Sequence, residues 1–193
     1  MKTGKEFTGV VKGKIVRYTF NKHNDIDGTE IDEGSHLSTI KFPPHTARFV
    51  LDVAAVGDNV ELRVKEKPHP PHHRKKNEKP KLHLVSIGRC DSADRFETDS
   101  IKPPHPPETG RLLKFVISNP RYTRGGKENT ITGLVFEGKF FHLHPEEYED
   151  DLTGAGRIEL WAKKRTEKSG FVNHEGLEVY HTHSVAIEAP SEA

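Results

Sequence analysis

Alternation of hydrophobic and polar positions is the main pattern along this chain, and it predicts a protein built mainly of β-strands. The clearest example is residues 60–64, where Val60, Leu62 and Val64 alternate with charged residues. Four more segments of the first half have strand-like composition, and they are residues 10–19, 26–31, 37–42 and 82–87. Between the third and fourth strands, residues 45–54 have apolar positions at helical spacing. The first half therefore predicts five strands with one short helix after the third.

The second half of the chain repeats this plan in a weaker form. Residues 132–133 match the turn at Asp27 and Gly28, and Pro145 ends a strand as Pro43 does, because proline cannot continue a hydrogen-bonded ladder. The predicted strands of this half are residues 112–117, 129–136, 140–144, 158–162 and 177–187, with a turn at 120–127 and one or two helical turns at 146–152. The chain is therefore interpreted as one small β module used twice.

Three strands, a helical connection and two further strands follow the order of the OB-fold, a small five-stranded Greek-key barrel. We therefore expect a mainly β protein with two tandem small OB-like barrels, each with a short helix after its third strand. The prolines within residues 101–107 predict a semi-rigid linker between a first domain of residues 1–100 and a second of residues 108–193. Periodicity alone leaves open whether the two halves are separate barrels or one fused sheet.

The first half contains four short motifs, namely the turn at 24–28, the glycine at 34, Phe-Pro-Pro at 42–44 and Gly-Asp-x-Val at 57–60. Together they resemble the pattern of a family of small, uncharacterised bacterial proteins with OB-like folds. The resemblance covers most of the first half, while the second half keeps Gly133, the exit at Pro145 and the alternating strand. This sequence has Asp-Ile-Asp where the family has Glu-Ile-Asp, and it has additional residues between Gly34 and Phe42. The resemblance implies an OB-like fold and no established reaction.

Composition narrows the class of protein. The chain has 193 residues, of which 32% are hydrophobic and 31% charged, so each half has room only for a narrow core. A formal net charge of +1 gives no overall argument for nucleic acid, so such an argument depends on local patches. Cys90 is the single cysteine, which excludes an intramolecular disulfide and suits a reducing cytoplasm. No apolar run approaches the roughly 20 residues of a membrane helix, so we expect a cytoplasmic protein outside the membrane.

Basic loops are the main functional signal in this sequence. OB barrels bind oligonucleotides across their second and third strands, between the loops that follow the first and fourth strands. In both halves the loop predicted after the fourth strand is basic, and the first loop of the second half adds further cations. Cations that contact phosphates, together with aromatic rings that stack on bases, are what single-strand binding requires. The predicted nucleic-acid-binding residues are Arg74, Lys75, Lys76, Lys79, Arg121, Tyr122, Arg124, Lys127, Phe140, Lys163, Lys164, Arg165 and Phe171.

Two other interpretations of these segments remain open. In one, the basic loops are only solvated surface and the aromatic rings fill a small core, because a fold alone does not imply a function. In the other, the proline-rich segments and exposed strand edges bind a partner protein, as in a scaffold module. The sequence does not distinguish DNA from RNA, and it does not indicate an oligomeric state.

Paired histidines give a further hypothesis, a transition-metal site. His142 and His144, like His181 and His183, are two residues apart, so each pair lies on one face of a strand. The third and fifth strands of an OB barrel are neighbours, which brings these rings within reach of each other. Neutral imidazole is a good ligand for zinc, nickel or copper. No cysteine and no suitably spaced carboxylate accompanies them, so scattered histidines are the simpler interpretation.

An enzymatic role finds no support in this sequence. Cys90 lies in no nucleophile motif, and the chain has no glycine loop for phosphate. The acidic residues within 146–151 are interpreted as the solvated start of a helix rather than a cation site. We therefore expect a binding protein without catalytic activity or cofactor. Its expected ligand is single-stranded DNA or RNA, with a protein partner or a metal ion as the alternatives.

Overall fold

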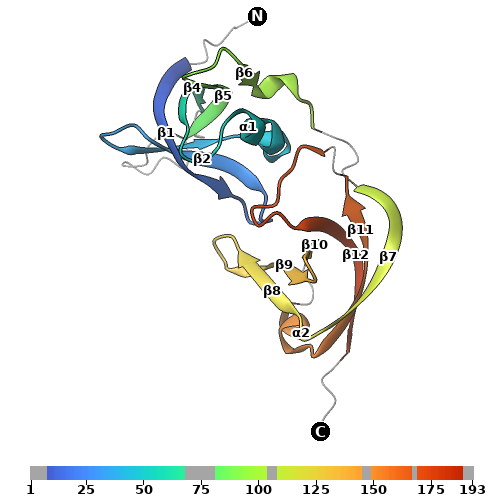
Figure 1. The fold of residues 1–193 in the computed structure, drawn as a ribbon. Helices are drawn as coiled ribbons and strands as arrows, with labels where there is room; N and C mark the ends of the chain where they lie inside the picture. Colours follow the sequence, from blue (N-terminus) through green and yellow to red (C-terminus); the bar gives the residue numbers. More distant parts are fainter. Residues whose placement is uncertain (1–7, 68–80, 104–107, 145–148, 167–168, 189–193) are drawn as a thin grey trace, which may run out of the picture. The chain divides into compact units, whose positions relative to one another are not determined.

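The computed structural model describes residues 8–67, 81–103, 108–144, 149–166 and 169–188. These residues form a mainly β protein with two six-stranded sheets (Figure 1). The chain divides into two compact units. The first unit comprises Met1–Thr19, Ile26–Pro103 and Gly170–Val172, and the second comprises Phe20–Asp25, Pro104–Ser169 and Asn173–Ala193. Two short segments therefore belong to a different unit from their neighbours in sequence, which the hydrophobic pattern did not indicate.

The first sheet contains β1 (Thr8–Phe20), β2 (Ile26–Asp32), β3 (Leu37–Lys41), β4 (Asn59–Glu66), β5 (Leu82–Arg89) and β6 (Arg95–Glu97). A 3-10 turn, η1 (Pro44–Thr46), and the helix α1 (Ala47–Val53) lie between β3 and β4, and η2 (Thr98–Ser100) follows β6. β3 ends just before Pro43 and Pro44, which lack the N–H groups that a ladder needs. After α1, Gly57 has a φ of +95°, a left-handed backbone that glycine adopts without strain and that turns the chain towards β4.

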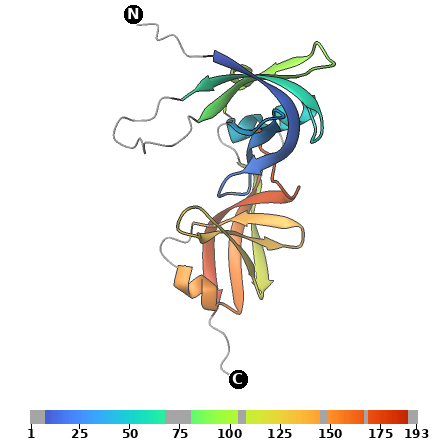
Figure 2. The same ribbon diagram turned by 90° about the vertical axis from the view of Figure 1, so that its left-hand side faces the viewer.

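The strand order of the first sheet is β3-β2-β1-β4-β5-β6, and an additional parallel pairing joins β3 to β5. This pairing closes the first five strands into a ring, in which the long, curved β1 pairs with both β2 and β4 (Figure 2). One apolar core belongs to this sheet, and Val60, Leu62 and Val64 of β4 are buried in it. Helix α1 adds Ala47 and Val50 to the same core. The alternating apolar residues of 60–64 therefore point into the core, as predicted, and the charged residues between them point away from it.

The second sheet contains β7 (Glu108–Ser118), β8 (Arg121–Gly125), β9 (Thr130–Phe136), β10 (Lys139–His142), β11 (Arg157–Arg165) and β12 (Glu178–Glu188). Their order is β7-β11-β12-β10-β9-β8, and helix α2 (Glu149–Gly154) lies between β10 and β11 in the chain. Only Asn119, with a φ of 50°, and Pro120, which has no N–H, separate β7 from β8. β7 pairs with β11 and β8 with β9, so these two strands take the place of the single strand β1. The core of this sheet includes Ile117, Leu134 and Phe141.

A parallel pairing occurs at the same place in both sheets. In the first sheet, Lys41 of β3 lies opposite His83 of β5. In the second sheet, His142 of β10 lies opposite His181 of β12. The residues that precede Lys41 and His142 belong to the two cores. Because successive strand residues point to opposite faces, both pairs point away from their core.

Two irregularities mark the same equivalence. Gly28 of β2 lies opposite Lys41, and Gly133 of β9 lies opposite His142. β5 has a β-bulge at Val85, two residues after His83, and β12 has one at His183, two residues after His181. At each bulge the pairing with the neighbouring strand skips that residue. Lys41 and His83 are therefore equivalent in position to His142 and His181, which fits a tandem arrangement of two similar modules.

Replacing Gly133 with Ala is expected to destabilise the second unit. A Cβ atom on Gly133 would lie 2.5 Å from Cζ of Phe140 and 2.5 Å from the backbone oxygen of Phe141, and both residues are fully buried. Because a backbone oxygen in a sheet cannot move freely, we expect the free energy of unfolding to fall by about 1–3 kcal/mol. Urea unfolding measures this loss. Gly154→Ala is the control, since a Cβ there has no atom within 4 Å, and equal midpoints for the two variants would contradict the close approach at Gly133.

Two observed strands were not predicted, and one predicted loop is wrong. β6 was not predicted, and β8 covers residues that we predicted as a turn. A basic loop was predicted from Lys163, but β11 continues to Arg165. β11 lies between β7 and β12 and pairs with both, and this pairing outweighs the low strand propensity of lysine. Residues 145–148, which include part of the second predicted helix, lie outside the described residues.

Candidate functional site

An open groove of about 540 Å³ lies along the first sheet, next to the parallel pairing of β3 and β5. Its lining residues come from β3, from the turn before it and from the start of β5; they are His36, Leu37, Ser38, Thr39, Lys41, Lys81 and Leu82. Leu37 is 56% exposed, so the groove has an accessible apolar surface. Ser38 and Thr39 add hydroxyl groups, and Lys41 and Lys81 add positive charge. A largely apolar cleft with a few convergent polar groups is typical of a binding site.

Four lysines gather around His83 beside this groove, and we call them the lysine patch: Lys41, Lys65, Lys67 and Lys81. Burial lowers the pKa of His83, and the charges of the four lysines lower it further. Lys65 lies near the end of β4 and Lys67 just beyond it, while Lys81 immediately precedes β5. The pairing of β5 with both β3 and β4 therefore brings these lysines to one end of the sheet.

The lysines of the patch differ in how they are held. Nζ of Lys41 lies 2.7 Å from Oδ1 of Asp27, and it donates a hydrogen bond to Thr19 at 3.4 Å. Lys67 and Lys81 are exposed, and neither side chain has an ion-pair partner among the described residues. The backbone N–H of Lys67 donates to the carbonyl of Lys81 at 3.2 Å, which keeps the two residues adjacent. Among the described residues, Lys67 and Lys81 therefore have no ion-pair partner, whereas Lys41 is held by Asp27.

The equivalent face of the second sheet is covered. Phe140 is fully buried, and His142 is 5% exposed although both side chains point away from the core. The rings of His142 and His181 lie 5.1 Å apart and nearly parallel, and Phe140 lies edge-on to His142 at 4.9 Å. His23 covers them, with its ring edge-on to His142 at 5.2 Å. We call His23, His142 and His181 the histidine cluster.

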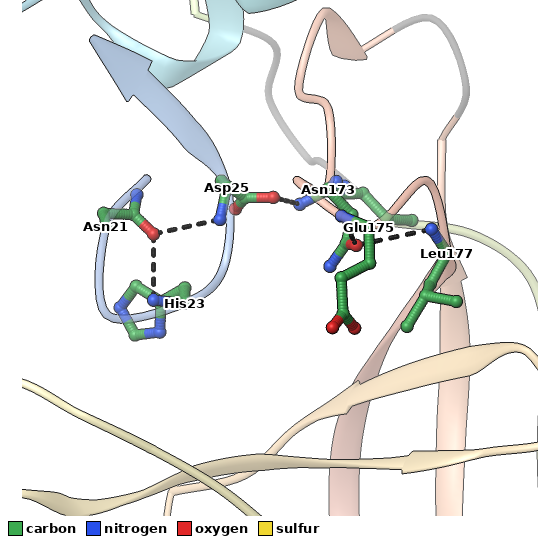
Figure 3. Close-up of polar contacts among 7 residues, drawn as sticks. Asn21, His23, Asp25, Asn173, Glu175 and Leu177 are labelled. Carbon is green, nitrogen blue, oxygen red and sulfur yellow. Dashed lines mark hydrogen bonds and ion pairs between the residues drawn. The ribbon is translucent and has the colours of Figure 1, made fainter. Parts of the chain in front are cut away.

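Residues 20–25, which we call the covering segment, bring His23 to this face and form a turn held by Asn21 (Figure 3). Oδ1 of Asn21 accepts hydrogen bonds from the backbone N–H groups of His23 at 2.8 Å and Asp25 at 3.2 Å. Asn24 has a φ of 61°, a conformation that asparagine tolerates in turns. The turn predicted from this polar composition is therefore present, and its side-chain hydrogen bonds fix its shape.

A second asparagine turn lies beside the covering segment (Figure 3). Oδ1 of Asn173 accepts hydrogen bonds from the backbone N–H groups two and four residues ahead, at 2.9 and 3.3 Å. Asp25 and Asn173 form an isolated antiparallel β-bridge, and the N–H of His174 donates to the carbonyl of Asn24 at 2.9 Å. The covering segment is thus attached to the second unit by backbone pairing as well as by ring contacts.

A buried ion pair joins the covering segment to β11. Nη1 of Arg165 lies 2.8 Å from Oδ1 of Asp25, and their side chains are 7% and 5% exposed. Two charges removed from water need each other, because an unpaired charge in such a position is strongly destabilising. Asp25 therefore brings a carboxylate to a buried guanidinium.

His142 is neutral at pH 7. Burial lowers the pKa of His142 to about 2, with smaller contributions from the charges of His181, His23, Arg165 and His144. Burial also lowers the pKa of His23, followed by the charges of Lys22 and His144. Nε2 of His142 is buried and has no hydrogen-bond partner among the described residues. A buried polar atom without a partner carries a desolvation cost, so its presence here calls for an explanation.

The residues predicted to bind nucleic acid occupy several places, and Arg74, Lys75, Lys76 and Lys79 lie outside the described residues. Arg121 and Arg124 are exposed on β8, and Lys127 is exposed in the turn that follows. Tyr122 is half-buried and packs against the second core, and burial raises the pKa of its hydroxyl group. The three cations are accessible to a ligand, whereas the Tyr122 ring is partly buried against the core.

The predicted basic loop of the second half lies in β11. Lys163 is half-buried, Lys164 pairs with Glu178 at 3.0 Å, and Arg165 forms the buried pair described above. These side chains alternate between the two faces of a strand, so they do not form one basic surface.

The other two predicted stacking rings, Phe140 and Phe171, lie in different units. Phe140 is fully buried, and its ring is not accessible to a base. Phe171 belongs to the first unit, where it is half-buried with its ring 6.4 Å from that of His45. Neither ring is therefore fully accessible to a base in this structure.

The predicted metal ligands separate into one contacting pair and two exposed residues. His142 and His181 stack on each other, whereas His144 and His183 are exposed. His183 is the residue skipped at the bulge of β12, so the simple alternation from His181 does not hold there. In the part of the chain that the structure describes, no group of three or more His, Cys, Asp or Glu side chains is arranged to hold a metal ion.

The lysine patch was not singled out from the sequence, although a signal was present. The strand order expected for an OB barrel places the ends of the third and fourth strands beside the start of the fifth. Lysines occur at each of these three points, and they are Lys41, Lys65, Lys67 and Lys81. The covering segment, in contrast, had no sequence signal beyond the polar composition of a turn.

Comparison with known proteins assigns this chain to no family. No family model, no curated protein and no solved structure matches it. Among the residues that the structure describes, no helix is both long and apolar enough to cross a membrane.

Proposed function

We propose that this protein binds single-stranded nucleic acid through the groove of its first unit, as a binding protein without catalytic activity. The observation that carries the proposal is the gathering of the lysine patch around His83. Clustered cations beside an apolar surface are the two elements of single-strand binding, because the cations contact phosphates and the surface receives bases.

The strand order supports an OB-like Greek-key barrel for each unit. In the first unit β4 lies beside β1 after the three consecutive strands β1, β2 and β3, which is the Greek-key order. In the second unit the same cyclic order results when β7 and β8 together are counted as the first strand. OB barrels bind oligonucleotides on their second and third strands, close to the loop after the fourth. The groove lies on β3, the third strand, beside the residues where that loop begins and ends.

Each part of the groove has a role in this proposal. Lys67 and Lys81 contact phosphates, since their side chains have no ion-pair partner among the described residues. Lys41 contributes charge while Asp27 keeps it in place. His36, whose side chain is 55% exposed, and Leu37 offer a ring and an apolar surface on which a base can stack. The exposed Arg121, Arg124 and Lys127 remain further candidates for phosphate contacts.

Changing Lys67 and Lys81 together to Glu is expected to abolish most of the binding. Each phosphate contact with a single strand contributes about 0.7 to the slope of log K against log salt, so losing two contacts should reduce the slope by about 1.4. The affinity at low salt should fall by more than about tenfold, because the new carboxylates also repel phosphates. Fluorescence anisotropy of labelled single-stranded DNA and RNA at several salt concentrations measures both quantities.

The control variant changes Lys14 and Lys102 to Glu, which alters the net charge equally at exposed positions of the first unit outside the lysine patch. It should retain most of the affinity and slope. Equal losses in the two variants would mean that only overall charge matters, and absence of binding by the unaltered protein at low salt would exclude the proposal.

Binding of a partner protein is the second candidate function, and it is favoured by β7. This strand lies at one end of the second sheet and pairs only with β11 among the described strands. Three large apolar side chains are exposed on it, Leu112, Leu113 and Val116, at 48%, 45% and 43%. An exposed strand edge with apolar side chains is a template for pairing with another chain. If the anisotropy experiment shows no binding, this becomes the leading candidate.

A further inference from the structure

The outer face of β10 and β12 occupies the place that the lysine patch occupies in the first unit. Lys41 and His83 are equivalent to His142 and His181, as the strand registers and the two bulges indicate. Beside Lys41 lies an open groove, and the Lys41 side chain is 37% exposed. His142 is 5% exposed because the covering segment lies over it.

The covered face has the chemistry of an anion site. Arg165 offers a guanidinium, which is suited to bidentate contacts with phosphate or carboxylate. His142 offers a buried Nε2 that has no hydrogen-bond partner among the described residues. The carboxylate that meets Arg165 there comes from Asp25, in the covering segment. Phe140 adds a ring on the same face, 4.9 Å from His142.

We infer that this face is a second binding site for single-stranded nucleic acid, masked by the covering segment, with Asp25 in the position of a phosphate on Arg165. The inference rests on the proposed function of the first unit. When the covering segment leaves, Arg165 receives a phosphate, His142 gains a hydrogen-bond partner and Phe140 becomes available to a base. The predicted roles of Phe140 and Arg165 then apply to the unmasked face only.

The covering segment lowers the apparent affinity of the second site. A site that is open in only a fraction of the molecules binds with an affinity reduced by that fraction. Replacing Asp25 with Asn keeps the shape of the side chain and removes the charge that holds Arg165. The covering segment is then held by weaker contacts, so the open fraction increases.

The test uses the full chain with Lys67 and Lys81 changed to Glu, so that the groove of the first unit no longer contributes. Adding Asp25→Asn should restore binding of a labelled single-stranded oligonucleotide, with an affinity at least about tenfold above that of the parent variant, if the face is normally open in about a tenth of the molecules or fewer. In a chain with the lysines intact, the same substitution should give binding to two sites at an oligonucleotide concentration at which the native chain fills only one.

A disulfide across the covering segment gives a reversible control. A Cβ on Gly125 would lie 3.4 Å from Cβ of Lys22, close to the separation of about 3.5–4.5 Å in disulfides. Lys22→Cys and Gly125→Cys are introduced together with Cys90→Ser, which removes the exposed native thiol. Oxidation should close the second site in the Asp25→Asn protein, and reduction should open it again. The same molecules are compared in both states, so a general folding defect does not explain a difference.

Each outcome is decisive. Equal binding by the oxidised and reduced forms would overturn the masked site, as would an Asp25→Asn variant that binds no better than its parent. If that variant fails to fold, the comparison is made with Asp25 present at saturating oligonucleotide, where only the reduced form should bind a second strand. Unaltered binding after Lys67 and Lys81 are changed to Glu in the otherwise native chain would instead count against the groove of the first unit. The proposed function and the masked site are therefore contradicted by different results.

Discussion

Replacing Arg165 with Met is expected to lower the free energy of unfolding by about 3–5 kcal/mol, the range observed when one partner of a buried ion pair is removed. Asp25, whose side chain is 5% exposed, would lose this cation. The β-bridge to Asn173 and the hydrogen bond from the backbone N–H of Asp25 to Oδ1 of Asn21 hold Asp25 at this place, so its carboxylate does not reach water without loss of those contacts. Urea unfolding followed by circular dichroism measures the change.

An exposed pair supplies the control for this prediction. Arg17 donates to both carboxylate oxygens of Glu30 at 2.7 Å, and its side chain is 67% exposed. Arg17→Met should therefore change the midpoint much less, because water compensates Glu30. The double variant Arg165→Met, Asp25→Asn should recover part of the loss, since it leaves no buried charge. Similar losses for Arg17→Met and Arg165→Met would show that burial is not the cause.

The strands were predictable because burial imposes a period of two on them. Val60, Leu62 and Val64 alternate in the sequence since they alternate between the core and the solvent in β4. Pro43 ended β3 as expected, because its missing N–H is a covalent property that no tertiary contact changes. Local chemistry of this kind is fully visible in a sequence.

The break between β7 and β8 shows where local chemistry was misjudged. Proline and glycine at 120 and 125 favoured a turn, yet residues 121–125 pair with β9. A backbone bend at Asn119 and Pro120 is enough to redirect the chain, so the second half reproduces one curved strand with two shorter ones. A bend between two strands and a loop contain the same kinds of residue. Only the backbone pairing of the residues on either side, here of β7 with β11 and of β8 with β9, distinguishes them.

The covering segment illustrates what a sequence does not contain. Asp25 and Arg165 are 140 positions apart, and nothing in the composition around either residue indicates the other. Arg165 looked like a member of a basic loop, because the anion that neutralises it comes from a distant turn. The lysine patch was easier to find in principle, since the expected strand order already brings its members to one end of a barrel.

Lowering the pH from 7 to 5 is expected to destabilise the second unit through His142. Burial lowers the pKa of His142 from 6.5 in the unfolded chain to about 2 in the folded one, so between these values the unfolded chain binds the extra proton. The stabilisation is therefore present above pH 6.5 and is lost as the pH falls. At about 1.4 kcal/mol per pH unit, His142 alone accounts for a loss of about 2 kcal/mol between pH 7 and pH 5.

The variant His142→Gln tests this assignment, because glutamine keeps a polar side chain and removes the proton-binding ring. Its free energy of unfolding should fall by about 2 kcal/mol less than that of the native chain over the same pH interval. His183→Gln is the matched control, since it removes an exposed histidine of the same strand, β12, and leaves His142 in place. It should keep the loss of stability that His142 causes. The groups that face His142 are His181, His23, Arg165 and His144, and none of them is altered in either variant. If His142→Gln keeps the native pH dependence, the proton is bound elsewhere and the burial of His142 does not control the acid sensitivity of this unit.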